Sequence, residues 1–356
     1  MAAGCRFFAG YPITPATSIY QQMLQLLPPT GGVCMQGEDE IASIGFCLGA
    51  SMAGLKAMTA TSGPGISLYS EQISFAIGGE IPLVIVDVQR LGPSTGSATK
   101  GADGDIQFLR WGNSGGMPVI VLAPVDVRDC YLLTIQAFNL AERYLCPVFI
   151  ASNKEIGMTR ENIDLDTLTI PEPEVRKPCP ADYSGRPFAP LPGEKVPPFL
   201  PMGGARLSRQ TSSTHGEDGY ISTDPAVIEA GILRMQEKLL STVGDFTLYE
   251  YDGHAEDSIL MVVYGVTARA AKTAVRQLRE AGDKVALLIL KTLYPVPEEC
   301  IRQHLHGKTR VVVIEMNLGQ YVREIERLAG NIPVRFYGRM NGELINSQDI
   351  VLKVRS

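Results

Sequence analysis

The stretch Leu83-Val-Ile-Val-Asp-Val-Gln89 is a short, nearly continuous apolar run, as expected for a strand buried on both faces of a sheet. Runs of the same kind recur around it, with helical stretches between most of them: Arg6–Gly10, Val33–Gln36, Ala57–Ala60, Val119–Leu122 and Val148–Ala151. Strands that alternate with helices predict a parallel sheet, whose ligands bind at the carboxyl ends of the strands. We therefore predict one α/β domain over residues 1–170.

The rest of the chain divides into a connection and a second domain. Ten prolines lie between Pro171 and Pro201, a density that excludes regular helices and sheet interiors. Residues 171–223 are therefore predicted to form an extended connection that wraps one domain onto the next. Residues 224–356 are predicted to form a second α/β unit, with strands at Ser258–Tyr264, Lys284–Leu290, Arg310–Glu315 and Pro333–Tyr337.

Composition excludes several classes of protein. The net charge of -6 and the lack of a basic stripe argue against nucleic-acid binding. No apolar run reaches the roughly 18 residues that cross a bilayer, and no secretory signal is visible at the N-terminus. Seven scattered cysteines without Cys-x-x-Cys spacing support neither a metal nor an iron–sulfur site in this chain. Free thiols in apolar contexts fit a reducing cytoplasm.

The first candidate site follows the first strand, in Tyr11-Pro-Ile-Thr-Pro15. Thr14 can cap the next helix, and Pro15 suits the first turn of that helix. A helix N-terminus also accepts polar ligand groups, so a purely structural role and a binding role both remain open.

The second candidate site is the acidic cluster Glu38-Asp-Glu40 at the start of a helix. Three acids there can simply stabilise the helix dipole, by up to ~1 kcal/mol each. The helix also places Ala42, Gly45, Gly49 and Ala53 on one face, which predicts the close approach of another backbone or helix. A carboxyl group at the mouth of such a helix would be partly desolvated and could share a proton with a ligand nitrogen.

The third candidate site is Thr61-Ser-Gly-Pro-Gly65, between a strand and a helix. Glycine-rich turns at this point of an α/β fold can cradle an anion. A tight turn with a serine or threonine helix cap explains the pattern at least as well.

The fourth candidate site is the stretch Asp87–Gly96, in which Arg90 directly follows the central strand. Sheet geometry aims a residue there into the ligand crevice, where a guanidinium can hold a carboxylate through two parallel hydrogen bonds. Pairing with a structural acid is the alternative. The segment Gly92-Pro-Ser-Thr-Gly96, which runs on to Thr99 and Lys100, is interpreted as an active-site or interface loop.

In this order, the motifs resemble the alpha subunit of the 2-oxoacid:ferredoxin oxidoreductases, and the 2-oxoglutarate branch most closely. The resemblance covers nearly the whole chain. It is carried by Gly10-Tyr-Pro-Ile-Thr-Pro15, Gly37-Glu-Asp-Glu-Ile-Ala42, Ala60-Thr-Ser-Gly-Pro-Gly65, Gln89-Arg90 with the loop after it, and Glu315-Met-Asn-Leu-Gly-Gln320. It implies that residues 1–170 contact the aminopyrimidine ring of thiamin diphosphate. It also implies that residues 224–356 resemble the transketolase C-terminal domain.

The resemblance also implies roles for single residues. Glu40 matches the glutamate that bonds the pyrimidine N1', with Glu38 and Asp39 as nearby alternatives. Thr14, together with Tyr11 and Pro12 of the same motif, matches the contact to cofactor and substrate. Arg90 matches the arginine that grips the 2-oxoacid carboxylate, and Thr99 a second contact on the substrate side. These matched positions are Glu40, Thr14, Tyr11, Pro12, Arg90 and Thr99.

What the chain lacks implies a partner. The sequence lacks the Gly-Asp-Gly…Asn motif that binds diphosphate and magnesium. The nearest string, Gly101-Ala-Asp-Gly-Asp105, differs from that form. In this family the beta subunit supplies the Mg²⁺–diphosphate site and a [4Fe-4S] cluster. The chain alone is then inactive and works as part of a heterotetramer with coenzyme A and ferredoxin. The alternatives are a pyruvate or branched-chain 2-oxoacid oxidoreductase, a decarboxylase subunit and a non-catalytic assembly subunit.

Overall fold

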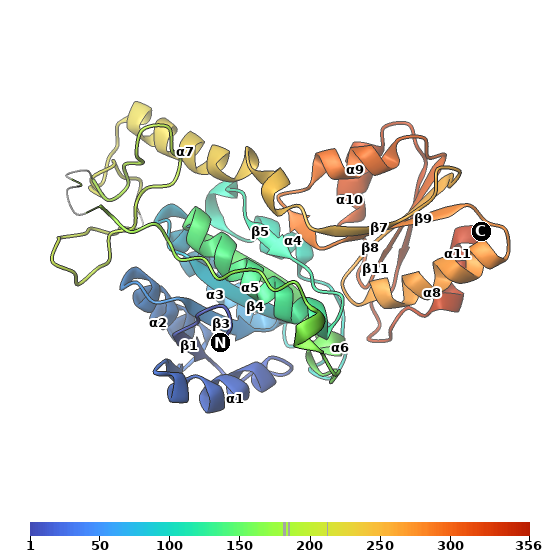
Figure 1. The fold of residues 1–356 in the computed structure, drawn as a ribbon, viewed down its shortest axis with the longest axis horizontal. Coiled ribbons are helices and arrows are strands. Elements are labelled where there is room, and N and C mark those ends of the chain that lie inside the picture. Colours follow the sequence, from blue (N-terminus) through green and yellow to red (C-terminus); the bar gives the residue numbers. More distant parts are fainter. Residues whose placement is uncertain (181–182, 184–185, 212) are drawn as a thin grey trace.

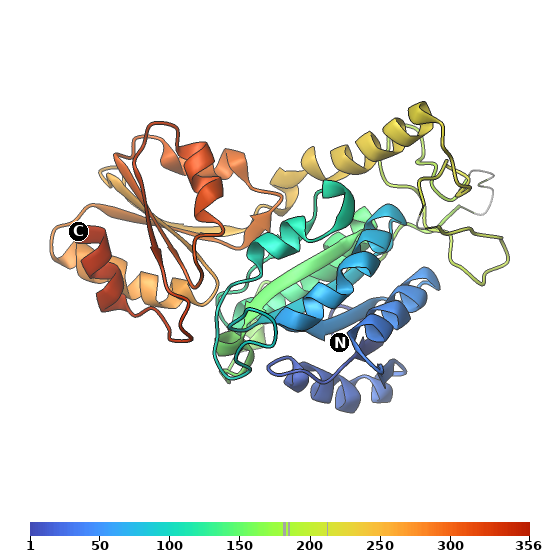
Figure 2. The same cartoon turned by 180° about the vertical axis from the view of Figure 1, so that it is seen from behind.

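The computed structural model describes residues 1–180, 183, 186–211 and 213–356. The predicted connection includes positions 181, 182, 184, 185 and 212, which lie outside the described residues. Two sheets, each flanked by helices, form an N-terminal and a C-terminal α/β unit. The C-terminal unit lies at one end of the molecule and the described part of 171–223 at the other, as both views show (Figures 1 and 2).

The N-terminal sheet has seven strands in the order β10-β5-β6-β4-β3-β1-β2. Every strand runs parallel to its neighbours except β10, which pairs antiparallel with β5. The predicted parallel sheet is therefore confirmed, with one added edge strand. The strands are β1 (Phe7–Gly10), β2 (Val33–Gln36), β3 (Ala57–Thr61), β4 (Leu83–Gln89), β5 (Ile120–Leu122), β6 (Pro147–Asn153) and β10 (Thr292–Tyr294).

Helices cover both faces of this sheet because its central strand is apolar on both sides. Leu83 and Ile85 of β4 pack in a core with α2 and α3, whereas Val84 and Val86 pack in a second core with α5. The helices of this unit are α1 (Thr17–Leu26), α2 (Glu40–Met52), α3 (Gly63–Gly78), α4 (Ile106–Trp111), α5 (Val127–Tyr144) and α6 (Lys154–Gly157). Short 3-10 turns lie at Pro28–Thr30, Ser114–Gly116, Leu165–Thr167 and Val243–Phe246.

The parallel register brings the carboxyl ends of the central strands to one edge. Asp87 of β4 stands opposite Thr61 of β3 and Ala151 of β6, and Gln89 stands opposite Asn153. The turns that follow β1, β3 and β4 therefore meet along this edge, where ligands of parallel sheets bind.

The C-terminal sheet has five strands in the order β12-β11-β8-β9-β7. In Figure 1, α8 and α11 lie on one of its faces and α9 and α10 on the other. The four predicted strands of this unit are present, and an antiparallel edge strand, β7, was missed. The elements are β7 (Tyr249–Asp252), β8 (Ile259–Tyr264), α8 (Thr267–Glu280), β9 (Val285–Leu290), α9 (Glu298–Leu305), β11 (Arg310–Glu315), α10 (Val322–Ala329), β12 (Val334–Gly338) and α11 (Ser347–Arg355).

The segment between the units packs onto the N-terminal one. Its described residues form isolated bridges and turns but no helix or strand. Arg176 anchors it through a buried ion pair with Glu142, at 2.7 Å, and a hydrogen bond of 2.7 Å to the Ser51 carbonyl. This contact supports the predicted wrapping connection.

Helix α7 (Pro225–Leu240) follows the connection and runs toward the C-terminal unit (Figure 1). It is held by Glu80 of the N-terminal unit, which pairs with Arg234 at 2.6 Å and with Lys238 at 2.7 Å. Burial alone would raise the pKa of Glu80, but the two cations outweigh it and hold that pKa below its ordinary value. The predicted domain limits at 170 and 223 stay predictions, because α7 contacts the first unit.

The structure also bears on the cysteines, on metal ligands and on membrane-spanning helices. All seven cysteines carry free thiols. Over the described part of the chain, no three His, Cys, Asp or Glu side chains are grouped so that they could hold a metal ion. None of the described helices is both long and apolar enough to cross a membrane.

Candidate active site

Three of the candidate motifs meet at the carboxyl edge of the N-terminal sheet. Arg90 follows β4 directly, and its Nη1 donates a hydrogen bond of 2.6 Å to the main-chain oxygen of Thr14, 76 residues away. Arg90 is 6% exposed, and its Nε has no hydrogen-bond partner within the described chain. No carboxylate of the described residues forms an ion pair with it. Within this part of the chain the structure therefore contains no direct ion pair at Arg90, although the charge of Asp105 acts on it from nearby.

Thr14 lies at the mouth of this edge, and its side chain is exposed. Helix α1 begins at Thr17, and Ala16 occupies the N-cap position without a side-chain hydrogen bond. The prediction that Thr14 caps this helix and Pro15 opens its first turn is therefore wrong. The Thr14–Pro15 peptide is cis, and both residues precede the helix. The Thr14 hydroxyl makes no cap and stays available at the edge.

The acidic cluster divides its roles among three residues. Asp39 is the N-cap of α2, since its Oδ1 accepts a hydrogen bond of 2.7 Å from the Ala42 N–H. Glu38 is exposed. Glu40 is the first helical residue, 7% exposed, and no hydrogen bond joins its carboxylate to any described residue. Of the three acids, only Glu40 is both buried and without a structural task.

Only some of the small residues on α2 face α3. A side chain on Gly45 would meet the Gln72 amide at 3.1 Å, and that amide donates a hydrogen bond of 2.7 Å to the Ile41 carbonyl. Nothing lies within 4 Å of a side chain placed on Gly49. The predicted close approach is therefore met at Gly45 by a side chain of α3, while the helix surface at Gly49 is open.

Gly65 joins the glycine-rich motif to the acidic one. A Cβ on Gly65 would collide with Thr61 Oγ1 and would lie 2.8 Å from Glu40 Cγ. Gly63, Pro64 and Gly65 form the first turn of α3 rather than a loop, and Ser62 occupies the N-cap position without a side-chain cap. The predicted serine or threonine cap is therefore wrong. Thr61 Oγ1 and Ser62 Oγ are buried and have no hydrogen-bond partner within the described chain.

Replacing Gly65 with alanine should lower turnover of the assembled enzyme by about 10- to 100-fold, because the new methyl group must displace Glu40 or Thr61. Steady-state rates and thermal unfolding of the same preparation measure the effect. Gly231→Ala in α7 is the matched control, since nothing lies within 4 Å of a Cβ there. It should keep full activity and stabilise the helix by up to ~1 kcal/mol. Unchanged turnover in Gly65→Ala would show that this contact does not position Glu40.

The remaining predicted site residues lie at the surface beside this cluster. The loop after Arg90 is closed by hydrogen bonds from the Leu91 N–H to the Lys100 carbonyl and from the Ser97 N–H to the Leu91 carbonyl, both 2.8 Å. Thr99 is exposed within this loop. Tyr11, which is 38% exposed, and Pro12 lie at the surface after β1. Their contacts to cofactor or substrate stay predictions.

Sequence reasoning assigned no role to a group of acids near Arg90 that the structure largely buries. Asp87 of β4 is fully buried, and Asp103 and Asp105 lie in the Gly101–Asp105 string before α4. Burial raises the pKa of Asp103 to about 7, although a hydrogen bond of 2.9 Å from Asn153 works against the rise. An acid within an apolar strand, as in Leu83–Gln89, was the signal that could have revealed them.

The Gly101–Asp105 string also joins the two α/β units. Asn317 Nδ2 donates a hydrogen bond of 2.9 Å to the Asp103 carbonyl, and Gln320 contacts Gly104. Glu315 is buried at the N-terminus of α10 and accepts hydrogen bonds from the Tyr321 and Val322 N–H groups. The Glu315–Gln320 motif therefore docks the second unit against the back of the candidate site.

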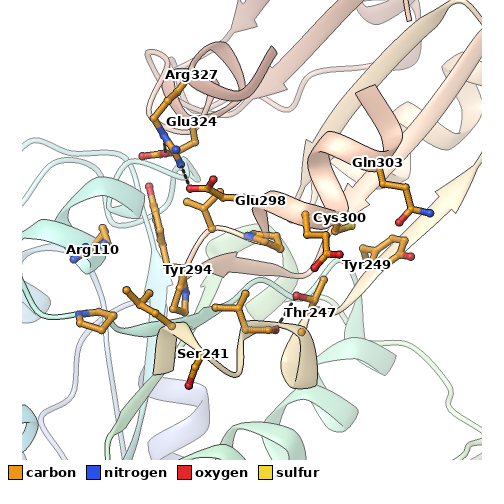
Figure 3. Close-up of a pocket in the computed structure, with 18 of the residues that line it drawn as sticks. Arg110, Ser241, Thr247, Tyr249, Tyr294, Glu298, Cys300, Gln303, Glu324 and Arg327 are labelled. Carbon is orange, nitrogen blue, oxygen red and sulfur yellow. Dashed lines mark hydrogen bonds and ion pairs between the residues drawn. The ribbon is translucent and has the colours of Figure 1, made fainter. Parts of the chain in front are cut away.

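A large cavity of about 860 Å³ lies elsewhere, between the two units (Figure 3). Its lining includes Arg110, Tyr294, Glu298 and Arg327, and none of Thr14, Glu40 and Arg90. We do not place the active site there, because the candidate residues lie along an open sheet edge. An open edge is the form expected of a site that a second subunit completes.

Comparison with known proteins agrees with this architecture. Residues 1–233 match the family model for "pyruvate flavodoxin/ferredoxin oxidoreductase, thiamine diP-bdg", and residues 257–350 match that for pyruvate:ferredoxin oxidoreductase core domain II. The 2-oxoglutarate synthase subunit KorA of Methanocaldococcus jannaschii is 41% identical over 354 residues, which are 98% of this chain and 93% of the relative.

Solved structures extend the likeness. A 2-oxoglutarate:ferredoxin oxidoreductase from Magnetococcus marinus, with 2-oxoglutarate, coenzyme A and succinyl-CoA bound, superposes with a TM-score of 0.92 at 33% identity over 99% of this chain. The chain spans 62% of that longer protein. A split-gene transketolase, described as an inactive beta4 tetramer, shares the fold alone, with a TM-score of 0.54 and 14% identity over 98% of this chain and 91% of its own.

The fold and the family models thus define a thiamin-diphosphate-binding α/β subunit of the oxidoreductase class. The chain belongs to the pyruvate flavodoxin/ferredoxin oxidoreductase family. This confirms the resemblance and the transketolase-like α/β fold predicted from the sequence.

Proposed function

We propose that this chain is the alpha subunit of a 2-oxoacid:ferredoxin oxidoreductase that acts on 2-oxoglutarate. The reaction converts the oxoacid and coenzyme A into acyl-coenzyme A and carbon dioxide, and two electrons pass to ferredoxin. The observation that carries the proposal is Glu40: a buried carboxylate at a helix mouth, without a partner in the described chain and at the same sheet edge as Thr14 and Arg90. The KorA relative and the Magnetococcus structure support the choice of 2-oxoglutarate.

The residues around Glu40 fit the aminopyrimidine half of thiamin diphosphate. No hydrogen bond joins the largely buried Glu40 side chain to the described chain, so its carboxylate is free for a ligand. Thr61 Oγ1 and Ser62 Oγ, in the neighbouring turn, are enclosed without hydrogen-bond partners in the described chain, as expected of groups that a ligand completes. When bound, thiamin diphosphate supplies the carbon nucleophile that attacks the 2-oxo carbon and lets carbon dioxide leave. The task of Glu40 is to hold a proton at the pyrimidine N1'.

Arg90 and Thr14 are suited to position the substrate. The hydrogen bond from Arg90 Nη1 to the Thr14 carbonyl fixes one end of the guanidinium and leaves the Nη2 N–H groups for a carboxylate. The exposed Thr14 and Thr99 side chains are available for polar contacts on the substrate side. Holding the oxoacid in this way makes attack on its carbonyl effectively unimolecular.

A second subunit completes the site in this proposal. The described residues hold no grouping of metal ligands, and the chain has no Gly-Asp-Gly diphosphate motif of the expected form. A beta subunit would bring the diphosphate and Mg²⁺ site and a [4Fe-4S] cluster, in a heterotetramer that works in the cytoplasm. The open edge at Glu40, Arg90 and Thr14 is the surface that it would cover.

Coexpression with the neighbouring beta subunit tests this function. The purified complex is screened with 2-oxoglutarate, pyruvate and 2-oxoisovalerate, with coenzyme A and a low-potential viologen as the acceptor. We expect viologen reduction that needs both subunits and is fastest with 2-oxoglutarate. Carbon dioxide release without acceptor reduction would favour a decarboxylase instead. No turnover of any oxoacid by an intact complex that carries its clusters would favour an assembly subunit.

A further inference from the structure

A cluster of buried polar side-chain atoms without hydrogen-bond partners lies next to Arg90. Both carboxylate oxygens of Asp87, Oδ2 of Asp105 and Nε of Arg90 are enclosed and accept or donate no hydrogen bond to the described chain as ordinary ionised groups. Asp87 is fully buried in β4. Asp105 stands at the N-cap position of the short helix α4 but makes no side-chain cap. The main chain therefore does not explain why an acid is needed at either position.

The two acids must share a proton. Ionised carboxylates only accept hydrogen bonds, so the hydrogen bond between Asp87 and Asp105 requires a proton on one of them. Burial raises the pKa of Asp87 well above its ordinary value, and the charges of Asp105 and Asp103 raise it further. Burial also raises the pKa of Asp105, to about 6, although a hydrogen bond from Asp87 and the charge of Arg90 oppose the rise. Near neutral pH, Asp87 is therefore neutral and donates, and Asp105 carries the charge.

The charge of Asp105 faces Arg90. A Cβ placed on Gly63 would lie 3.9 Å from Arg90 Cγ and 3.9 Å from Asp105 Oδ2, so both side chains border the same glycine. The groups that face Asp105 are Asp87 and Arg90 from β4 and its end, and Asp103 from its own segment. Among the described residues, Arg90 is the cation whose charge lowers the pKa of Asp105.

The segment that carries Asp105 is held in place without its carboxylate. The Asp105 N–H donates a hydrogen bond of 2.9 Å to Gln89 Oε1. The Asp103 N–H donates one of 2.9 Å to the Met316 carbonyl. These bonds fix the backbone, so the side chain of Asp105 is left for another task.

We propose that Asp105, with Asp87 behind it as proton donor, is a positioning residue that orients the Arg90 guanidinium for the carboxylate of the oxoacid. This inference rests on the proposed function, in which Arg90 grips the substrate. The Thr14 carbonyl holds only Nη1 of that guanidinium, and a single hydrogen bond lets the planar group swing. The nearby charge of Asp105 adds a second constraint, which favours the orientation in which two parallel N–H groups point to the substrate.

The test is Asp105→Asn in the complex of alpha and beta subunits. We expect the KM for the oxoacid to rise on the order of tenfold, with kcat changed far less, because a misdirected guanidinium loses its paired hydrogen bonds. In the wild type, kcat/KM should fall as the pH drops through about 6, where Asp105 takes up a proton. This acid limb should vanish in Asp105→Asn. Asp87→Asn should keep the limb, because its amide can donate to Asp105 as the protonated acid does.

The possible results distinguish failure of this inference from failure of the proposed function. If Arg90→Ala raises the KM but Asp105→Asn changes neither the KM nor the pH profile, the positioning role is overturned and the proposed function stands. If Arg90→Ala leaves the KM unchanged, the proposed substrate contact itself fails. Should Asp105→Asn not assemble, the wild-type profile still decides, since a kcat/KM that is flat from pH 5 to about 7 overturns the proposal.

Discussion

Replacing Glu40 with glutamine in the assembled complex should abolish oxoacid-dependent reduction of ferredoxin, with a loss of at least ~100-fold. Glutamine keeps the size of the side chain but cannot exchange a proton with a ring nitrogen. Glu40 has no hydrogen-bond partner within the described chain, so its loss should not unfold the protein. The rate of ferredoxin reduction with saturating oxoacid and coenzyme A measures the effect. Unfolding temperature and subunit stoichiometry should match the wild type.

The chain offers matched controls for this substitution. Glu38→Gln makes the same change in charge at an exposed position beside the site and should leave the rate unchanged. Asp39→Asn should also stay active, because asparagine caps a helix about as well as aspartate. Full activity in Glu40→Gln would remove Glu40 from its role. Loss in Glu38→Gln with activity kept in Glu40→Gln would move that role to the neighbouring acid.

The sheet elements could be predicted because burial leaves a strong local pattern. Strands β4 and β11 begin and end as the apolar runs predicted, and β4 is buried along its whole length. A run that is apolar on both faces is stable only inside a covered sheet, so its role does not depend on distant parts of the chain.

Two edge strands, β7 and β10, could not be predicted in the same way. β7 is largely exposed and alternates little, and β10 is a three-residue strand that pairs with β5 of the other unit. Their pairing depends on where the rest of the chain places a free edge, which no local window contains. The cap assigned to Thr14 failed for a related reason. The helix begins at Thr17, and the local sequence fits a start there as well as one at Pro15.

The candidate site was predicted as separate residues, whereas its contacts were not. Spacing placed Glu40 and Arg90 at the ends of their elements, but three acids at one helix mouth look alike in sequence. Burial and the cap on Asp39 distinguish them in the structure. The hydrogen bond from Arg90 to Thr14 spans 76 residues, and the Asp87–Asp105 pair spans two elements. Such contacts appear only when the sheet brings the strand ends together.

Arg90 supplies the second large effect, on substrate binding rather than on the cofactor. Arg90→Ala should raise the KM for the oxoacid by about 10- to 100-fold, because a hydrogen bond to a charged group contributes ~1.5–3 kcal/mol and leaves a carboxylate unpaired when it is lost. Arg90→Lys should recover only part of this, since an ammonium keeps the charge but not the planar fork. Initial rates over a range of 2-oxoglutarate concentrations, with coenzyme A saturating, separate KM from kcat.

The control for Arg90 is Arg276→Ala, which removes an exposed arginine from α8 of the other unit and should change neither constant. Because Arg90 also holds the Thr14 carbonyl at 2.6 Å, a fall in kcat beyond about tenfold would show that the turn carrying Thr14 has shifted as well. Thr14→Val tests that turn separately, since it removes the hydroxyl and keeps the backbone acceptor. If Arg90→Ala bound 2-oxoglutarate as tightly as the wild type, the carboxylate of the substrate would have to be held by the other subunit, and Arg90 would be a brace for the Thr14 turn alone.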